Sequence, residues 1–410
     1  MTSYETPLPA PPERPLVRVL GDRAAARCLL AVLVSGFGTS ALWLVAGVWT
    51  KELTGSDGLA ALCAFALWAP TLAGPLLGAI ADRVRRRRLL VTVNLASACL
   101  VLALFAVDGP GRLWLLFAVL FLYGACGVVA DAAESAWVAG AVPGDVLGEL
   151  NGLRMSVNEG VKIVAPLAGA ALFAAYGGSR VALLDAVTFV VAAGLFASVP
   201  GRDPRPVRRA GARAADGLRE LWRHGELRPL LLSGSGVMAL SGITGASVFA
   251  VVDGLGRAPA FTGVLYAVQG VGSVAAGALS GGLLRRLGAR RFAAYGIALF
   301  ALGAAVRAVP YDAAVLAGSA AIGAGLPCPL VAALTAVQRA LPDEVLGRAS
   351  AAAHTLLFTP GALTLAVGAG LVVVAPVGVL LPVMGGVGLL LAAACHGGGR
   401  RSGSAVTAPE

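Results

Sequence analysis

The chain has 410 residues, of which 58% are hydrophobic and 13% are charged, and its mean hydropathy is +0.82. A soluble domain cannot bury so large a share of apolar residues, so this composition excludes a soluble protein and indicates an integral membrane protein. The net charge of +10 would also suit a nucleic-acid-binding protein, and the positions of the arginines decide whether that class applies.

Apolar segments long enough to cross a bilayer follow one another along the chain. Each can span a hydrocarbon core of about 30 Å as a helix, the only open-ended structure that satisfies its own backbone groups in lipid. In chain order the predicted spans are 28–50, 58–81, 89–107, 113–141, 152–176, 179–199, 229–252, 259–284, 291–309, 312–337, 345–370 and 372–395. The sequence therefore predicts an all-α integral membrane protein with twelve transmembrane helices.

The arginines gather in alternate connections between these spans. They occur at 83–88, at 202–228 and at 285–291, whereas the intervening connections are short and nearly neutral. By the positive-inside rule the basic side is cytoplasmic, and both termini lie on that side. Because topology explains the positive charge, no nucleic-acid partner is expected.

Motifs for enzymatic or metal chemistry do not occur in the sequence. There is no nucleotide-cradling P-loop, no H-E-x-x-H and no G-x-S-x-G in a strand-turn-helix setting. The six cysteines fall in or beside apolar spans without C-x-x-C pairing, which favours small core residues over a disulfide framework or a metal site. The first 27 residues are Pro-rich and charged, unlike a secretory signal. We expect no enzyme activity, no cofactor and no metal.

Two internal matches divide the chain into similar halves. The segment from Gly78 aligns with that from Gly281, an offset of 203, and the segment from Pro143 aligns with that from Pro342, an offset of 199. We interpret the halves as parallel six-helix repeats with a central path between them. The predicted domains are a cytoplasmic tail at 1–27, a six-helix bundle at 28–199, a cytoplasmic linker at 200–228, a second six-helix bundle at 229–395 and a cytoplasmic tail at 396–410.

The connection between the second and third spans carries a specific pattern. From residue 78 it reads Gly-Ala-Ile-Ala-Asp-Arg-Val-Arg-Arg-Arg. This resembles the Gly-x-x-x-Asp-Arg-x-Gly-Arg-Arg signature of the major facilitator superfamily, with Arg85 in place of one glycine. The resemblance covers about residues 20–396 and implies the major facilitator fold, with two pseudo-symmetric halves of six helices. It also implies a conformational gate at the cytoplasmic helix ends, formed by Gly78, Asp82, Arg83, Arg86 and Arg87. The alternative is that these residues only anchor the topology.

Further phrases resemble one branch of that family, the bacterial exporters that include macrolide-efflux and enterobactin-exporter proteins. They are 150–153, 165–169, 184–189 and 217–222. The branch implies efflux, and the substrate does not transfer with it. The span-five pattern of drug antiporters is matched only at Pro166 and Gly169, so export does not follow from that pattern alone.

Ionisable residues inside the spans mark candidate proton-coupling sites. Each costs about 2.5–3.5 kcal/mol at a helix centre and is therefore seldom without a function. Asp131 and Glu134 lie three residues apart in the fourth span, and Glu159 and Lys162 lie three apart in the fifth, with Arg154 nearby. Counted from the cytoplasmic ends of their spans at about 1.5 Å per residue, Asp131 and Glu159 are predicted at similar depth, roughly 10–15 Å inside the membrane.

Two interpretations of this cluster remain open. In the structural one, Lys162 and Arg154 neutralise the carboxylates and hold the two helices in register. In the functional one, three carboxylates face two cations, so one carboxylate titrates and couples proton exchange to transport. Asp131 is the first candidate for that carboxylate and Glu134 the second.

Other polar residues are candidates for the wall of a central cavity, although one sequence does not fix helix rotation. They are Ser35, Thr39, Trp43, Gln269 and His354. Asp185 is expected to serve helix packing, and Asp253 and Arg307 are expected at the solvated extracellular interface.

These observations predict a multi-pass protein of the bacterial cytoplasmic membrane, a monomer in the lipid bilayer with a small-molecule substrate and the proton as partners. The function that we expect is proton-coupled export, by alternating access, of a lipophilic or amphipathic molecule such as an antibiotic, drug or siderophore. This is multidrug-type antiport. An importer or facilitator of the same fold is one alternative. A non-transporting membrane sensor is another, and the absence of a sizeable soluble domain counts against it.

Overall fold

The computed structural model describes residues 19–81, 84–141, 144–199, 214–341 and 343–397. These residues are almost entirely helical, and none of them forms a strand. The first half contains α2 (Arg23–Thr54), α3 (Asp57–Trp68), η1 (Ala69–Ala73), α4 (Gly74–Ala81), α5 (Arg86–Leu102), η2 (Ala103–Ala106), η3 (Pro110–Arg112), α6 (Leu113–Ala141), α7 (Gly144–Tyr176) and α8 (Gly178–Ser198). The second contains α9 (Ala214–Arg223), α10 (Leu227–Ala246), α11 (Val248–Gly254), η4 (Pro259–Phe261), α12 (Thr262–Leu287), α13 (Ala289–Val306), α14 (Asp312–Gly325), α15 (Pro327–Ala340), α16 (Asp343–Val374) and α17 (Val377–Gly397).

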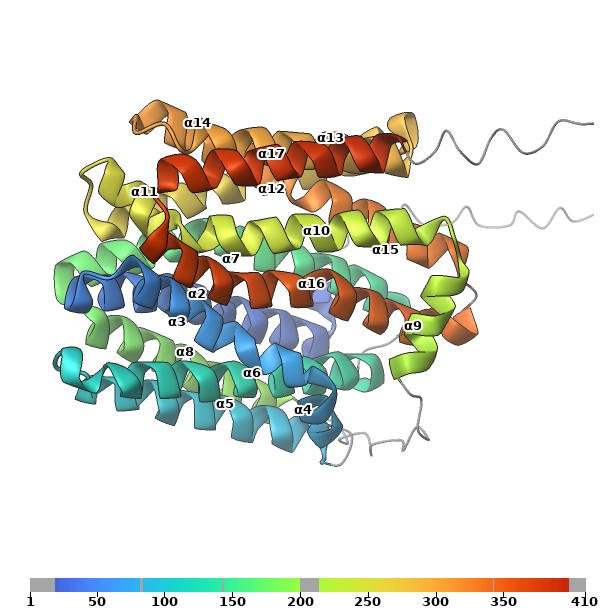
Figure 1. Ribbon diagram of the computed structural model, residues 1–410. Coiled ribbons are helices and arrows are strands. Elements are labelled where there is room, and N and C mark those ends of the chain that lie inside the picture. Colours follow the sequence, from blue (N-terminus) through green and yellow to red (C-terminus); the bar gives the residue numbers. More distant parts are fainter. Residues whose placement is uncertain (1–18, 82–83, 142–143, 200–213, 342, 398–410) are drawn as a thin grey trace, which may run out of the picture.

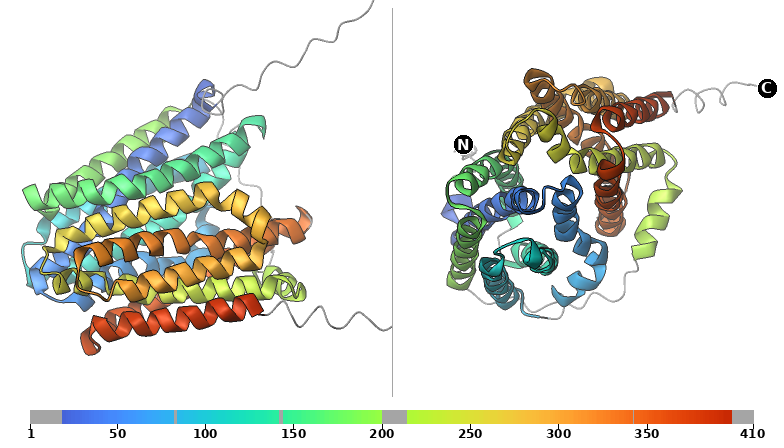
Figure 2. Two further views of the ribbon diagram at one scale, coloured as in Figure 1. Left: turned by 90° about the horizontal axis from the view of Figure 1, so that it is seen from above. Right: turned by 60° about the vertical axis from the view of Figure 1, so that its left-hand side comes forward.

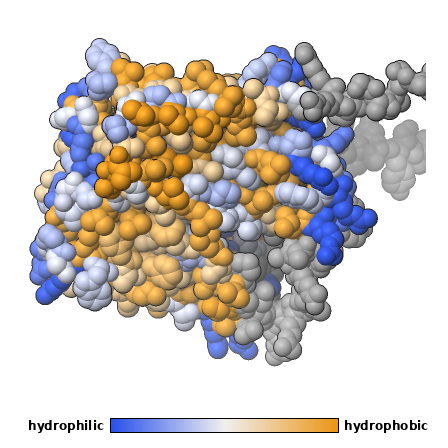
Figure 3. Space-filling view, in the orientation of Figure 1, coloured by the Kyte–Doolittle hydropathy of each residue, from blue (hydrophilic) through white to orange (hydrophobic). Residues whose placement is uncertain are grey.

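The helices confirm the predicted twelve-span, all-α fold. Ten described segments are long and apolar enough to cross a membrane, and two shorter apolar stretches, Asp57–Ala73 and Gly160–Tyr176, complete the expected number. The second span consists of α3, η1 and α4, the seventh of α10 and α11, and the tenth of α14 and α15. The molecule also shows a broad apolar band between hydrophilic ends in Figure 3, as a protein surrounded by lipid must.

Short polar residues and a glycine fix both ends of α2 and the start of α3. The side chain of Asp22 accepts hydrogen bonds from the backbone N–H groups of Ala24 and Ala25, so α2 begins five residues before the predicted span. Gly55 ends α2 in the left-handed region (φ 68°), where a side chain would be strained. Ser56 then caps α3.

Prolines interrupt two of the spans. Pro70 lies in the 3-10 segment η1 that divides the second span, and Pro327 begins α15 directly after the break at Leu326 in the tenth. Proline has no backbone N–H and clashes with the preceding turn, so it ends one helical segment and begins another. The predicted spans at 58–81 and 312–337 are therefore divided into consecutive helical segments.

The helices form two groups, α2–α8 and α10–α17, that lie on opposite sides of the molecule (Figures 1 and 2). At one end of the molecule lie the start of α5, α9 and the α12–α13 connection, which carry or adjoin the clustered arginines. We call this the basic end. The other end, which contains the turn at Gly55 and the connection at 255–258, we call the closed end.

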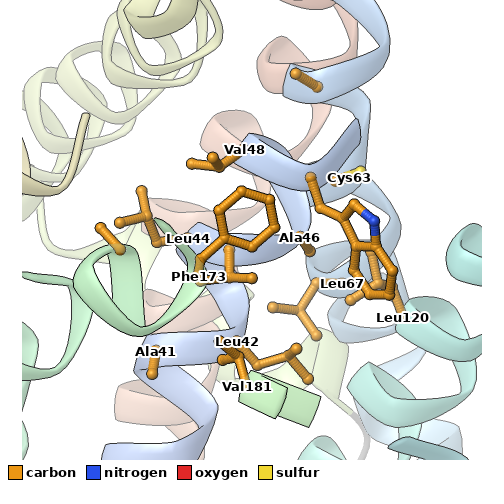
Figure 4. Packing of buried hydrophobic residues seen from close by; sticks show 14 of the residues in the cluster. Ala41, Leu42, Leu44, Ala46, Val48, Cys63, Leu67, Leu120, Phe173 and Val181 are labelled. Carbon is orange, nitrogen blue, oxygen red and sulfur yellow. The ribbon is translucent and has the colours of Figure 1, made fainter. Parts of the chain in front are cut away.

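Buried apolar side chains join the two halves near the closed end. The largest cluster surrounds α2 and includes Leu44 and Phe173 of the first half together with Phe249 and Leu265 of the second (Figure 4 shows part of it). Two further clusters each belong to one half, one around Trp137 and one around Phe300. Burial of apolar surface therefore holds the halves together mainly around the closed end.

Glycines permit the close contact between the halves there. A side-chain carbon on Gly263 of α12 would lie 3.0 Å from the Cβ of Ala170 on α7, and one on Gly58 of α3 would lie 2.8 Å from the carbonyl oxygen of Ala369 on α16. Toward the basic end, by contrast, Gly277 and Gly282 of α12 have nothing within 4 Å of such an atom. Within the described residues, the halves touch at the closed end and diverge toward the basic end.

Candidate functional site

An ion pair connects the fourth and fifth spans, where the sequence predicts the coupling cluster. Glu134 on α6 accepts a hydrogen bond from Arg154 on α7, and their side chains keep only 14% and 19% exposure. Asp131 lies three residues before Glu134 on α6 with an exposed side chain, and Arg154 acts electrostatically on both carboxylates. The described part of the cluster thus places two carboxylates near one guanidinium.

The other two predicted members lie on α7. The side chain of Glu159 is outside the described residues, so the expected approach of Glu159 to Asp131 stays a prediction. Lys162 has an exposed side chain. The expected neutralisation of carboxylates is realised at the Arg154–Glu134 pair.

Only part of the predicted gate is described. Asp82 and Arg83 lie outside the described residues, and Gly78 belongs to α4. Arg86 is half-buried at the start of α5, and Arg87 donates to the carbonyl oxygen of Ala197 in the last turn of α8. Because helix C-termini carry unpaired carbonyls and partial negative charge, this arginine stabilises the basic end of the first half.

Ser35, Thr39 and Trp43 share one face of α2, since they are spaced by four residues. The two hydroxyl groups donate to backbone carbonyls one turn back, Ser35 to Ala31 (2.8 Å) and Thr39 to Ser35 (2.9 Å). The Trp43 ring meets Tyr266 of α12 edge to face, with centroids 4.7 Å apart. Its indole Nε1 is buried and has no hydrogen-bond partner among the described residues. This face of α2 therefore contacts the second half at Trp43, whereas Thr39 contacts Tyr123 of α6 in the first half.

The second half contributes the remaining cavity candidates. Gln269 on α12 is half-buried, next to the close approach of Gly323 on α14 to its backbone. His354 on α16 is exposed and stacks on Phe358, with ring centroids 5.5 Å apart. Both residues lie on helices that contact the first half.

Two polar clusters of the structure were not predicted from the sequence. In the first, Lys51 at the end of α2 pairs with Asp57 on α3 (2.7 Å) and with Asp253 on α11 (2.5 Å). The pair with Asp253 crosses between the halves at the closed end. Lys51 is one of only two lysines in the chain. That rarity marks the residue in the sequence but does not predict its partners.

The second cluster surrounds Asp185 in the middle of α8. Asp185 is fully buried, and its carboxyl oxygens contact the hydroxyl groups of Tyr123 on α6 (3.1 Å) and Thr188 (3.3 Å). The Tyr123 hydroxyl also contacts Thr39 Oγ1 at 2.9 Å. The sequence predicted a packing role for Asp185 but did not predict these partners, because they come from three different helices.

Arg307 corrects one expectation. The sequence suggested a solvated position at the interface, but the residue is 4% exposed and packs against Gly318 of α14. Because Gly318 has no side chain, the side chain of Arg307 can pack directly against α14 and remain buried. Asp253 does keep a solvated side chain, with 44% exposure. No group of three or more His, Cys, Asp or Glu side chains that could hold a metal ion occurs in the described part of the chain.

Comparison with family models decides the assignment that the fold suggests. The model of the Major Facilitator Superfamily matches residues 28–365, which is most of the chain. The protein belongs to the Major Facilitator Superfamily. It is accordingly a multi-pass membrane transporter rather than an enzyme, and it moves a small-molecule substrate. No curated protein matches the sequence significantly.

Solved structures of this superfamily share the fold at low sequence identity. A mutant of the nucleoside transporter NupG superposes with a TM-score of 0.76 at 12% identity, covering 91% of this chain and 98% of that one. A bacterial homologue of the iron transporter ferroportin, in an inward-facing state, gives 0.69 at 18%, with the same coverage. A D-xylose-proton symporter gives 0.70 at 13%, covering 91% and 96%. These similarities concern the fold alone.

Proposed function

We propose that this superfamily member is a proton-coupled exporter of a lipophilic or amphipathic small molecule, such as an antibiotic, drug or siderophore. The observation that carries the proposal is the cluster on α6 and α7, where Asp131 and Glu134 lie near the single guanidinium of Arg154. One arginine can neutralise one carboxylate. The second carboxylate is then available to bind and release a proton.

Proton binding at Asp131 supplies the coupling in this mechanism. When the halves diverge at the basic end, an exposed Asp131 exchanges its proton with water. When they close around it, burial disfavours the charged form and the carboxyl group keeps its proton. Glu134 is the second candidate, because rearrangement of α7 would move Arg154 from one carboxylate to the other. Glu159 and Lys162 are proposed to adjust the charge of the same cluster.

The way the halves meet supports alternating access. Contacts at the closed end and divergence at the basic end describe one state, and rocking of the halves would give the other. The central path is proposed to pass Ser35, Thr39 and Trp43 of α2, with Gln269 and His354 opposite. Aromatic rings at Trp43, Tyr266 and Phe358 suit a substrate with apolar surface.

The gate and the topology complete the proposal. Asp82, Arg83 and Arg86 would form charge-assisted bonds at the basic end when the halves close there, and these bonds would differ between the two states. The arginine-rich connections support a position of the basic end in the cytoplasm of a bacterial cell, with both termini on that side. The resemblance to macrolide-efflux and enterobactin exporters supports export, and the transporter is proposed to act as a monomer.

An importer or facilitator of the same fold is the main alternative. Among the similar structures is a D-xylose-proton symporter, so the fold is also compatible with symport. A non-transporting sensor is the alternative of another class. It would bind a ligand in the central path without flux.

The test uses inverted membrane vesicles that maintain a proton gradient, to which antibiotics, dyes and siderophores are added one at a time. An exported compound should dissipate the gradient in wild-type vesicles and should fail to do so with Asp131→Asn. A matched control is Asp108→Asn, because Asp108 pairs with Arg112 in an exposed connection and should not affect coupling.

If the Asp131→Asn and Glu134→Gln variants dissipated the proton gradient as fully as the wild-type protein, the assignment of the coupling site would be refuted. Compound uptake without any change in the gradient would indicate a facilitator. Binding without uptake in purified, reconstituted protein would indicate the sensor.

A further inference from the structure

A second buried carboxyl group lies apart from the cluster on α6 and α7. Asp185, in the middle of α8, has 0% exposure, and among the described residues it forms no ion pair. A carboxylate buried without a cation is expensive, whereas a protonated carboxyl group needs only hydrogen-bond partners. The charge state of Asp185 can therefore be inferred from its hydrogen bonds.

Hydroxyl groups connect Asp185 to α2 in a series of three contacts. Asp185 Oδ2 lies 3.1 Å from Tyr123 Oη, Tyr123 Oη lies 2.9 Å from Thr39 Oγ1, and Thr39 Oγ1 lies 2.9 Å from the carbonyl oxygen of Ser35. Each contact needs one hydrogen. Tyr123 and Thr39 carry one hydroxyl hydrogen each, so two hydrogens serve three contacts unless the carboxyl group supplies the third.

Thr188 does not supply the missing hydrogen to this series. Its hydroxyl lies 2.7 Å from the backbone carbonyl of Asp185 and 3.3 Å from Oδ1, the other carboxyl oxygen. The shorter contact is the better hydrogen bond. The series is therefore complete only when Asp185 donates from Oδ2 to Tyr123, Tyr123 donates to Thr39, and Thr39 donates to the carbonyl of Ser35.

We propose that Asp185 is a proton-binding site, protonated in this conformation and linked by Tyr123 and Thr39 to the face of α2 that meets the second half at Trp43. The protonation stands on the geometry alone. Its role in coupling rests on the proposed function.

Among the described residues, no charged group on the elements around Asp185 forms an ion pair with its carboxyl group. On α8 itself Arg180 lies in the first turn. On α2 the charges lie near the helix ends, at Arg23, Arg27, Lys51 and Glu52, and on α5 they lie at 86–88. On α6 the charged residues are Asp131 and Glu134, and the described side chains of α7 include Arg154 and Lys162. The groups that act on the Asp185 side chain are the hydroxyls of Tyr123 and Thr188. Gly38 closes the site, because a side-chain carbon there would lie 2.2 Å from Asp185 Oδ1.

Release of the proton would reverse the direction of the hydrogen bonds between Asp185 and Tyr123 and between Tyr123 and Thr39. The hydrogen of Asp185 passes to Tyr123 Oη as the Tyr123 hydrogen passes to Thr39 Oγ1, and the original Thr39 hydrogen leaves to a water molecule in the central path. The result is a carboxylate that accepts from Tyr123, which in turn accepts from Thr39. One proton has left to water, each of the two hydroxyl groups has exchanged one O–H bond for another, and the hydrogen bond from Thr39 to the carbonyl oxygen of Ser35 is lost. Thr39 is half-buried, so the series leads from a fully buried group to a partly exposed one.

Infrared difference spectroscopy tests the protonation directly, because a protonated carboxyl group has a carbonyl band well separated from carboxylate bands. The spectrum of purified wild-type protein minus that of Asp185→Asn, at neutral pH, should contain this acid band. The band should shift in heavy water. The matched control Asp108→Asn, an exposed carboxylate paired with Arg112, should remove carboxylate bands only.

Tyr123→Phe provides a second test that keeps the carboxyl group. It removes the acceptor of the Asp185 hydrogen, so the acid band should move to higher frequency, and Thr39→Val should move it less. A difference spectrum for Asp185→Asn that contains only carboxylate bands would overturn the proposal, as would an acid band unaffected by Tyr123→Phe. Neither result depends on transport, so both can be separated from a failure of the Asp131 assignment.

Discussion

At the scale of the residue, the ionisable side chains inside the spans fall into environments of different charge. Glu134 shares Arg154 with Asp131, whereas the side-chain partners of Asp185 in the described part of the chain are hydroxyl groups. Composition and spacing could identify all these carboxylates as costly residues. Spacing could also name Arg154 as a partner within the cluster on α6 and α7. It could not identify Tyr123 and Thr39 as the groups linked to Asp185, because they come from helices whose rotation depends on packing.

The Glu134–Arg154 pair should show strong coupling in a double-mutant cycle. Arg154→Met leaves a largely buried carboxylate without its cation, which costs about 3–5 kcal/mol for a fully buried pair and less here, since the side chains keep 14% and 19% exposure. The double variant with Glu134→Gln should recover much of the lost thermal stability. Additive losses in melting temperature would show that the two side chains do not interact.

Gly38→Ala should destabilise the first half. The added carbon would lie 2.2 Å from Asp185 Oδ1 and 2.3 Å from Thr188 Oγ1, and overpacking of this kind costs about 1–3 kcal/mol. Gly36→Ala is the matched control, since its added carbon would lie 3.8 Å from Asn158 Oδ1. The measurement is the melting temperature of each purified variant, and equal values for the two would contradict the packing described at Asp185.

At the scale of the element, the sequence could predict nearly every helix, because long apolar runs in a membrane protein have no stable alternative to helices. It could not predict the breaks within them. Pro70 and Pro327 interrupt the second and tenth spans, but Pro166, Pro360 and Pro382 lie inside continuous helices. The effect of a proline depends on whether neighbouring groups satisfy the carbonyl that it leaves free.

The contact of α7 with α12 should control the balance between conformations. A side-chain carbon on Gly270 would lie 2.7 Å from Ile163 Cγ1, so Gly270→Val should force the halves apart at the closed end. Gly277→Val on the same helix is the control, because nothing lies within 4 Å of its added carbon. Pulsed electron paramagnetic resonance between spin labels at Glu52→Cys and Val374→Cys should give longer distances for Gly270→Val only. Identical distributions in both variants would contradict this role.

At the scale of the whole molecule, the conformation depends on where the halves meet. A shared apolar cluster and the Lys51–Asp253 ion pair join them at the closed end. The sequence repeat could predict two halves, but not which end is closed, because that is a property of the state and not of the fold. The family signature that suggests the gate lies partly outside the described residues, so the gate stays a prediction.

Lys51→Gln should loosen the closed end. The Lys51 side chain is 9% exposed and serves Asp57 and Asp253 together, so its loss leaves two carboxylates side by side without a cation. The spin-label distances across the closed end should lengthen, as for Gly270→Val. Arg112→Gln, which removes an exposed pair with Asp108, should leave them unchanged. Unaltered distances in Lys51→Gln would show that apolar packing alone holds this end.

Proton-coupled transport through Asp131 is the central claim, and the most direct measurement imposes a substrate gradient on purified protein in liposomes that start without a pH difference. A pH-sensitive dye in the lumen reports proton movement. For wild-type protein we predict that substrate moving in one direction drives protons in the other, and that Asp131→Asn abolishes this proton movement. Substrate movement by wild-type protein with no change in luminal pH would contradict the claim.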